Sequence, residues 1–164
     1  MEVLEVMEVM EKNGKGREGP IRRHSDLVIF KLAYKLALEV SKLTKTFPRE
    51  ERFELGRQLR RSARSIVANI VEGWAKRHSP AEFKRHLMIA TGECAETGLW
   101  LQFSADEGAA MRDNCAALQT QYSKLGLMIY RLWKTWKKLD VGERPELPVT
   151  SKTSRTSGAY ERPH

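Results

Sequence analysis

The sequence predicts an all-α fold, namely an antiparallel up-down-up-down four-helix bundle. Apolar residues recur at alternating spacings of four and three along four long segments, as they do on the core-facing side of bundle helices. No segment combines the alternation of a strand with hairpin turns. The 164 residues, 41% of them hydrophobic, suffice for one domain with a full core. We expect this domain to span 25–139, between a flexible N-terminal tail (1–24) and a disordered C-terminal tail (140–164).

The first helix is expected to begin at Ser25 or Asp26, because either side chain can cap the free N–H groups of a helix start. It should run to about Thr46, just before Phe47 and Pro48. Its apolar positions follow the bundle spacing: Ile29, Ala33, Leu36, Val40, Leu43 and Phe47.

The second helix is expected to begin around Pro48, since proline suits the first helical turn, and to end near Arg77. At 3.6 residues per turn its two sides differ sharply in character. One side is apolar and should enter the core: Leu59, Ala63, Ile66, Ile70 and Trp74. The opposite side is basic and is the candidate nucleic-acid-binding surface: Arg57, Arg60, Arg61 and Arg64.

The third helix has the clearest start, because Ser79-Pro80-Ala81-Glu82 combines a capping box with proline at the first helical position. Its core positions are Phe83, Leu87, Ala90, Cys94, Thr97 and Leu101, and a break is expected near 104–108. The fourth helix repeats the spacing at Met111, Cys115, Leu118, Tyr122, Leu125, Ile129, Leu132, Trp136 and Leu139. Connections of about two to six residues make each helix reverse on the one before it.

Several helices carry more apolar surface than one bundle core needs. Exposed apolar faces promote association, so we expect them to contact other subunits of a homo-oligomer. A wide, irregular core within one chain is the alternative interpretation. The candidate interface residues are Phe53, Val67, Val71, Met88, Ala95, Leu99 and Phe103.

The net charge of +8 is concentrated in the predicted bundle, which holds 20 Lys and Arg against 12 Asp and Glu. A positive folded surface favours nucleic acid or another polyanion, through counterion release and electrostatic steering. Ordinary solubility charge is the alternative. No uncharged stretch within the bundle approaches the roughly 20 residues of a membrane span, and the start lacks a secretory signal, so a cytoplasmic location is expected.

No constellation of catalytic or metal-binding residues stands out, so we expect no enzyme activity, metal or other cofactor. Glu93 and Glu96 lack the histidine three positions later that a di-iron bundle site needs. Cys94 and Cys115 fall on core positions and are expected to be buried free thiols. Asn69 and Glu72 are interpreted as members of a structural hydrogen-bond or salt-bridge network in preference to a catalytic carboxylate site.

Several short motifs resemble one protein family. The chain is similar to the four-helix-bundle proteins encoded within intervening sequences of bacterial large-subunit ribosomal RNA genes, and to the related accessory variability determinant, Avd, of diversity-generating retroelements. The matching residues are 24–30, 47–52, 58–63, Ser65-Ile66, Asn69-Ile70, Glu72-Gly73 and 83–90. The chain departs from the usual pattern at Val67, where the family has a proline, and at Ala68 and Val71, so its second helix should be straighter.

The resemblance implies a homopentameric barrel of four-helix subunits with a positive surface and no known enzymatic activity. For the retroelement branch it also implies binding of nucleic acid and of a reverse transcriptase. Our leading hypothesis is a non-catalytic, nucleic-acid-binding accessory protein. The alternative is a structural or protein-interaction module whose arginines form ion pairs between subunits with Glu50, Glu51 or Glu54. A helical nuclease or metal enzyme is a third, weaker hypothesis.

Overall fold

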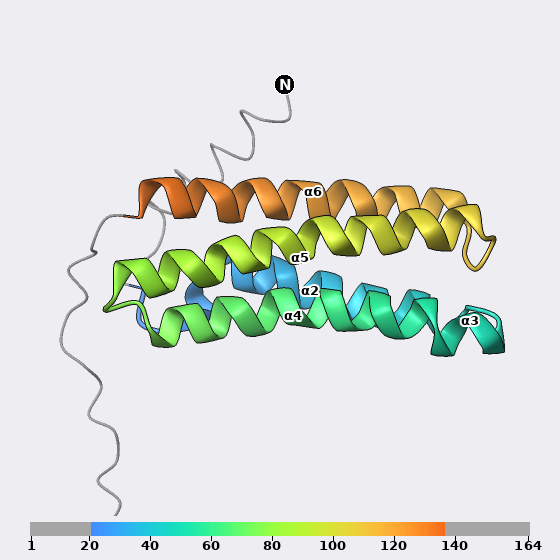
Figure 1. Ribbon diagram of the computed structural model, residues 1–164, viewed down its shortest axis with the longest axis horizontal. Helices are drawn as coiled ribbons and strands as arrows, with labels where there is room; N and C mark the ends of the chain where they lie inside the picture. Colours follow the sequence, from blue (N-terminus) through green and yellow to red (C-terminus); the bar gives the residue numbers. More distant parts are fainter. Residues whose placement is uncertain (1–20, 137–164) are drawn as a thin grey trace, which may run out of the picture.

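The computed structural model describes residues 21–136, and in this range it contains only helices, turns and loops. Four long helices dominate (Figure 1); a short helical turn precedes the first of them, and a short helix lies between the first and the second. In chain order the elements are η1 (His24–Asp26), α2 (Val28–Leu43), α3 (Arg49–Phe53), α4 (Leu55–Ala75), α5 (Pro80–Asp106) and α6 (Arg112–Thr135). Of the predicted N-terminal tail (1–24), residues 1–20 lie outside the described residues, as do Leu139 and the predicted C-terminal tail (140–164). The last residue of the predicted N-terminal tail, His24, begins η1.

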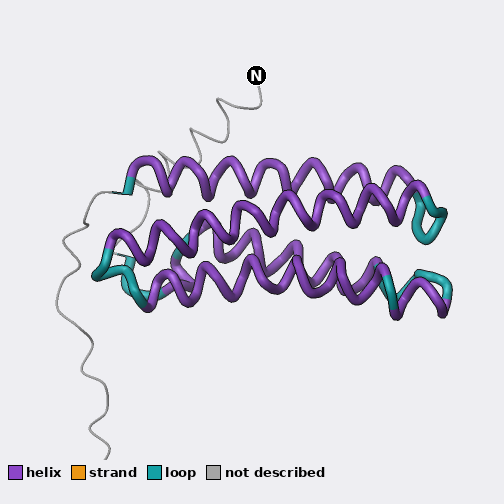
Figure 2. Tube along the Cα trace, viewed as in Figure 1, coloured by secondary structure: helices purple, strands orange, loops and turns teal. Residues whose placement is uncertain are grey.

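The four long helices lie side by side with their long axes roughly aligned (Figure 2). Neighbouring helices contact one another in a closed ring, in which α4 packs on α2 and α5, and α6 packs on α5 and α2. One turn joins α4 to α5 at one end of the bundle, and another joins α5 to α6 at the opposite end (Figure 1). The ring encloses a single apolar core.

The predicted spacing identifies the buried side of each long helix. All five predicted core residues of α4, and all six of α5, are at most 5% exposed. Two positions, Leu43 and Leu132, are only half-buried. Met111 was wrongly expected in the core, because it precedes α6 in an extended conformation and is 71% exposed.

The start of the first long helix differs from the prediction. Asp26 accepts hydrogen bonds from the backbone N–H groups of Arg22 and Arg23, at 3.1 and 3.0 Å, and so stabilises the short η1 turn. Leu27 is then extended, and α2 begins at Val28 without a side-chain cap. The helix ends at Leu43, three residues before the expected Thr46.

The predicted second helix is divided in two. Glu54 adopts φ −91° and ψ −81°, outside the helical region, and separates α3 from α4. Pro48 is extended and lies just before α3, so it is not the first helical residue. Beyond the break α4 runs without interruption from Leu55 to Ala75, through Val67.

The predicted start of α5 is confirmed. Ser79 accepts a hydrogen bond from the backbone N–H of Glu82 at 3.5 Å, and Pro80 is the first helical residue. The reciprocal half of the capping box is absent, since the Glu82 carboxylate instead accepts from Arg85 at 3.1 Å. The helix ends at Asp106, within the break that was expected near 104–108.

Candidate nucleic-acid interface

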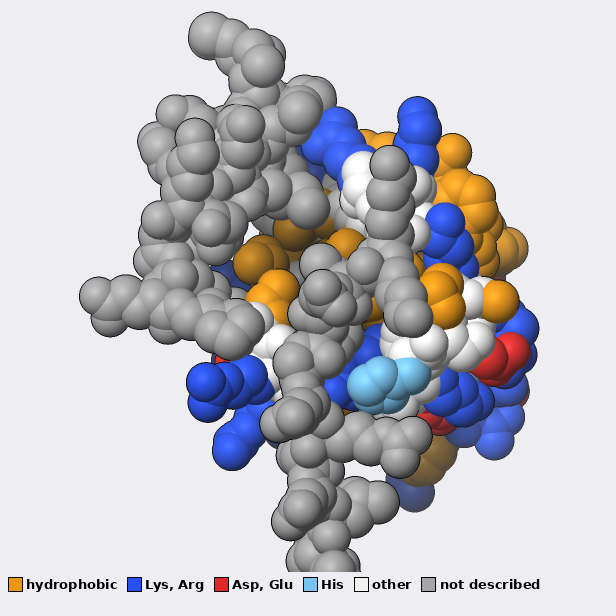
Figure 3. All heavy atoms as spheres, turned by 90° about the vertical axis from the view of Figure 1, so that its left-hand side faces the viewer, with side chains coloured by type: hydrophobic (Ala, Val, Ile, Leu, Met, Phe, Trp, Pro, Cys, Tyr) orange, Lys and Arg blue, Asp and Glu red, His pale blue; other side chains and the backbone are white. Residues whose placement is uncertain are grey.

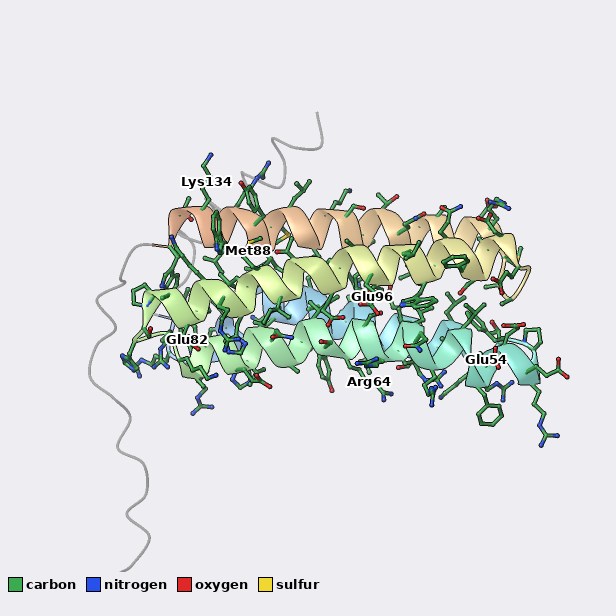
Figure 4. All side chains as sticks on the ribbon, viewed as in Figure 1. Glu54, Arg64, Glu82, Met88, Glu96 and Lys134 are labelled. Carbon is green, nitrogen blue, oxygen red and sulfur yellow. The ribbon has the colours of Figure 1, made fainter. Side chains whose placement is uncertain are left out.

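Four arginines lie on the outer side of α4, and we call them the arginine cluster: Arg57, Arg60, Arg61 and Arg64. Three of them are exposed, whereas Arg60 is half-buried. Among the described residues, none of the four forms an ion pair with a carboxylate. Figure 4 shows Arg64 on the edge of α4 away from α5. The cluster therefore presents positive charge that the rest of the described chain does not neutralise.

Arg60 has a second role in the fold. Its guanidinium donates a hydrogen bond to the backbone carbonyl of Arg52 at 3.3 Å. Arg52 in turn donates to the carbonyls of Lys45 and Phe47, at 3.0 and 3.2 Å, and holds the loop between α2 and α3. Burial lowers the pKa of Arg60, and the nearby charges of Arg64 and Arg52 lower it further.

The arrangement suits an anionic ligand for a physical reason. Like charges held close together repel, and an anion bound among them removes that repulsion. Within the described residues the side chains of Arg57, Arg61 and Arg64 form no hydrogen bond or ion pair, so their planar donor groups remain available to phosphate oxygens. The neighbouring acidic residues Glu50 and Glu51 form no ion pair with them within residues 21–136.

The predicted interface residues all reach the protein surface, to different degrees. On α5 the exposed residues form one face that includes Gly92, beside which an added Cβ would have no neighbour within 4 Å. Met88 and Glu96 mark this helix in Figure 4. The exposed residues of the set are Phe53, Met88, Ala95, Leu99 and Phe103, while Val67 and Val71 are half-buried.

Asn69 and Glu72 both face a buried histidine, His86 of α5. The Asn69 side-chain oxygen lies 3.1 Å from His86 Nδ1, and a Glu72 carboxylate oxygen lies 3.7 Å from the same nitrogen. Lys76 Nζ lies 3.1 Å from His86 Nε2. Asn69 also donates to the carbonyl of Ser65 at 3.0 Å. The two predicted polar residues are thus joined to one network across α4 and α5.

The hydrogen-bond partners of His86 determine which of its two ring nitrogens carries the hydrogen. An ammonium group can only donate, so Nε2 accepts from Lys76, and Nδ1 carries the hydrogen that it donates to Asn69. Burial lowers the pKa of His86, with smaller contributions from Lys76 and Arg85. The nearby Glu72 and Glu82 act in the opposite direction. The neutral ring is therefore a structural link between the helices.

Sequence reasoning missed His86, which is 17 residues from Asn69 and lies on the buried, mainly apolar side of α5. It also gave little weight to the basic residues around the turn between α4 and α5. Figure 3 views the end of the bundle that carries this turn, where Lys and Arg side chains gather around the rim and few acidic groups are visible. The stretch Lys76-Arg77-His78, followed by Lys84 and Arg85, was the available signal.

Within residues 21–136, no group of three His, Cys, Asp or Glu side chains is placed to hold a metal ion. No helix of this range is long and apolar enough to span a bilayer. Cys94 and Cys115 are buried free thiols, as predicted. Burial is the main cause that raises the pKa of Cys94 to about 12.

Comparison with known proteins identifies the family of this chain. The sequence pattern of the family described as 23S rRNA-intervening sequence protein matches residues 25–131. The chain belongs to this family. A crystal structure from Bacteroides thetaiotaomicron, described as a protein with unknown function from the S23 ribosomal protein family, is similar to this intervening sequence protein, with 27% sequence identity and a TM-score of 0.61. The similarity covers 66% of this chain and 96% of that chain. No curated protein matches the sequence.

Proposed function

We propose that this intervening sequence protein is a non-catalytic, oligomeric, cytoplasmic accessory protein that binds nucleic acid through the arginine cluster. The observation that carries the proposal is the set of guanidinium groups on α4 without a carboxylate partner in the described chain. Phosphates of a polynucleotide would supply the missing negative charge and release condensed counterions. Because the contacts would be to phosphates, binding should depend little on sequence.

The oligomeric part of the proposal rests on the exposed apolar face of α5. Leu99 is 51% exposed and Met88 43% exposed, and both would be covered by a second subunit. We propose a pentameric barrel of antiparallel, up-down-up-down bundles, the assembly implied by the resemblance to the family and its retroelement relatives. Repetition of the arginine cluster around such a ring would raise the avidity for a long polyanion without any further contact.

A reverse transcriptase is the protein partner implied by the same resemblance. Its association would place the bound polynucleotide beside a polymerase. Co-expression with a reverse transcriptase encoded by a neighbouring gene, followed by affinity purification, tests this part separately from nucleic-acid binding. Co-elution at a fixed ratio after nuclease treatment is the expected result, and separate elution would contradict it.

An alternative function is a structural or protein-interaction module without a nucleic-acid role. It is favoured by one observation, namely that Glu50, Glu51 and Glu54 are exposed or half-buried next to the cluster and form no ion pair within the described chain. Between subunits these carboxylates could pair with the arginines. The arginines would then be closed to phosphates.

Binding of a 20-nucleotide single-stranded DNA, measured by filter retention, tests the proposed function. Combined Arg61→Ala and Arg64→Ala substitution should weaken binding by about tenfold or more, because two phosphate contacts are lost per subunit. The matched control, Lys42→Ala with Lys134→Ala, removes the same charge from two exposed positions elsewhere. Equal weakening by both pairs, or none by the arginine pair, would contradict the proposal.

A further inference from the structure

Three aromatic rings form a continuous ladder at the start of the bundle, which we call the aromatic ladder: His24, Phe30 and Tyr34. The rings of His24 and Phe30 meet edge to face, with centroids 4.8 Å apart and planes at 70°. Phe30 and Tyr34 are stacked, with centroids 6.0 Å apart and planes at 22°. Phe30 packs against the core, whereas Tyr34 is 53% exposed. The ladder therefore holds the exposed ring of Tyr34 in place at the protein surface.

The ladder lies beside α4, the helix that carries the arginine cluster. A Cβ built on Gly56, at the start of α4, would lie 3.5 Å from the Cβ of Thr44, just after α2. The η1 turn, before α2, also contacts α4, so α2 follows α4 along most of its length. Counted from Thr44 and Gly56, Tyr34 and Val67 are each about 15 Å away along their helices at 1.5 Å per residue. Tyr34 is thus level with Val67, less than one turn of α4 beyond Arg64.

Helical periodicity places the two features on the same outer side of the bundle. Leu43 of α2 and Leu118 of α6 line one pocket, so this flank of α2 faces α6. Tyr34 comes nine residues before Leu43, and at 3.6 residues per turn it lies on the opposite flank of α2, toward its other neighbour α4. On α4 the half-buried Val67 is three residues after the exposed Arg64. An aromatic surface and a row of guanidinium groups consequently run along the two sides of one seam between α2 and α4.

We propose that this seam is a track for single-stranded nucleic acid, in which unpaired bases stack on Tyr34 while the backbone phosphates contact the arginine cluster. This inference rests on the proposed function and adds the class of ligand. Bases of a duplex are already stacked on their neighbours, whereas those of a single strand have free faces. Exposed aromatic rings beside a positively charged groove are the combination that single-strand-binding proteins use.

A comparison of three probes tests the track, using a 20-nucleotide oligo(dT), a 20-base-pair duplex DNA and inorganic polyphosphate. The Tyr34→Ala variant should bind oligo(dT) about tenfold more weakly, because one base loses the ring on which it stacks. Its affinities for the duplex and for polyphosphate should remain those of the wild type, because neither offers an unstacked base. Tyr34→Phe keeps the ring and should retain oligo(dT) binding.

The matched control is Tyr130→Ala, since Tyr130 is a second exposed tyrosine, on α6, and 43% exposed. It should leave all three affinities unchanged. Wild-type binding to none of the probes would overturn the proposed function itself. Wild-type binding to all three with unaltered oligo(dT) affinity in Tyr34→Ala would overturn the track alone. A lower particle mass of Tyr34→Ala in light scattering would assign Tyr34 to a subunit contact and would also overturn the track.

Discussion

Gly73 of α4 and His86 of α5 approach so closely that no side chain fits between them. A Cβ built on Gly73 would lie 2.9 Å from the Cβ of His86 and 3.1 Å from the ring of Phe83. Contacts this short force neighbouring atoms to move. The glycine thus allows α4 and α5 to meet at the level where His86 reaches its partners Asn69 and Lys76.

Gly73→Ala should therefore destabilise the protein, although alanine is normally the better helix former. We expect a loss of about 1–3 kcal/mol in the free energy of unfolding, measured by urea denaturation. Gly98→Ala is the control, because an added Cβ there meets only the side chain of Gln119 at 3.8 Å. That substitution should be neutral or should stabilise by up to about 1 kcal/mol. Equal effects at the two positions would refute the close approach.

The stability contribution of His86 should decrease at acidic pH. Burial, Lys76 and Arg85 lower its pKa in the folded protein, so the unfolded chain binds the extra proton more readily. This contribution is fully present above the unfolded pKa of about 6.5 and is lost as pH falls toward the folded value. Unfolding free energies at pH 7.5 and 5.0 should differ more for the wild type than for His86→Asn. The exposed His78, changed to Asn, should leave the wild-type difference intact.

Both cysteine thiols should resist modification in the folded protein. Cys94 is 4% exposed and Cys115 1% exposed, and burial raises the pKa of both. The reactive thiolate is therefore scarce and shielded. Iodoacetamide labelling followed by mass spectrometry should show little reaction under native conditions and complete reaction of both thiols in concentrated urea. Rapid native labelling would mean that the core opens readily at these positions.

The exposed face of α5 should be required for assembly. Leu99→Glu would bury a charge in the proposed subunit contact and should reduce the particle mass to that of a monomer. Leu127, which is 56% exposed on α6, offers a control of the same chemistry. Leu127→Glu should leave the mass unchanged in size-exclusion chromatography with light scattering. A wild-type protein that is already monomeric would contradict the oligomer.

The core of this fold was predictable from sequence because each long helix repeats its apolar positions regularly. The burial of a side chain such as Ile66 or Leu87 follows from its position in that repeat, and the local spacing of apolar residues determines this position. Helix ends were less predictable, since they depend on competing hydrogen bonds. Asp26 could have capped α2 but instead accepts from two backbone groups before it.

The arginine cluster was predictable as a set of exposed charges, but its internal differences were not. The link from Arg60 to the carbonyl of Arg52 depends on the break at Glu54, which no sequence signal marked. The His86 network depends on the packing of two helices at Gly73. Such contacts join residues far apart in sequence, and a single chain without its relatives does not reveal which residues become neighbours.

The central claim is that the arginine cluster binds polynucleotide phosphates, and the salt dependence of binding tests it most directly. The logarithm of the association constant for the 20-nucleotide DNA should fall linearly with the logarithm of KCl concentration. Each phosphate contact should contribute about 0.7 to the magnitude of the slope. Combined substitution of Arg57, Arg61 and Arg64 by alanine should reduce this slope by about two for each subunit engaged. An identical slope in the wild type and the triple variant would contradict the claim.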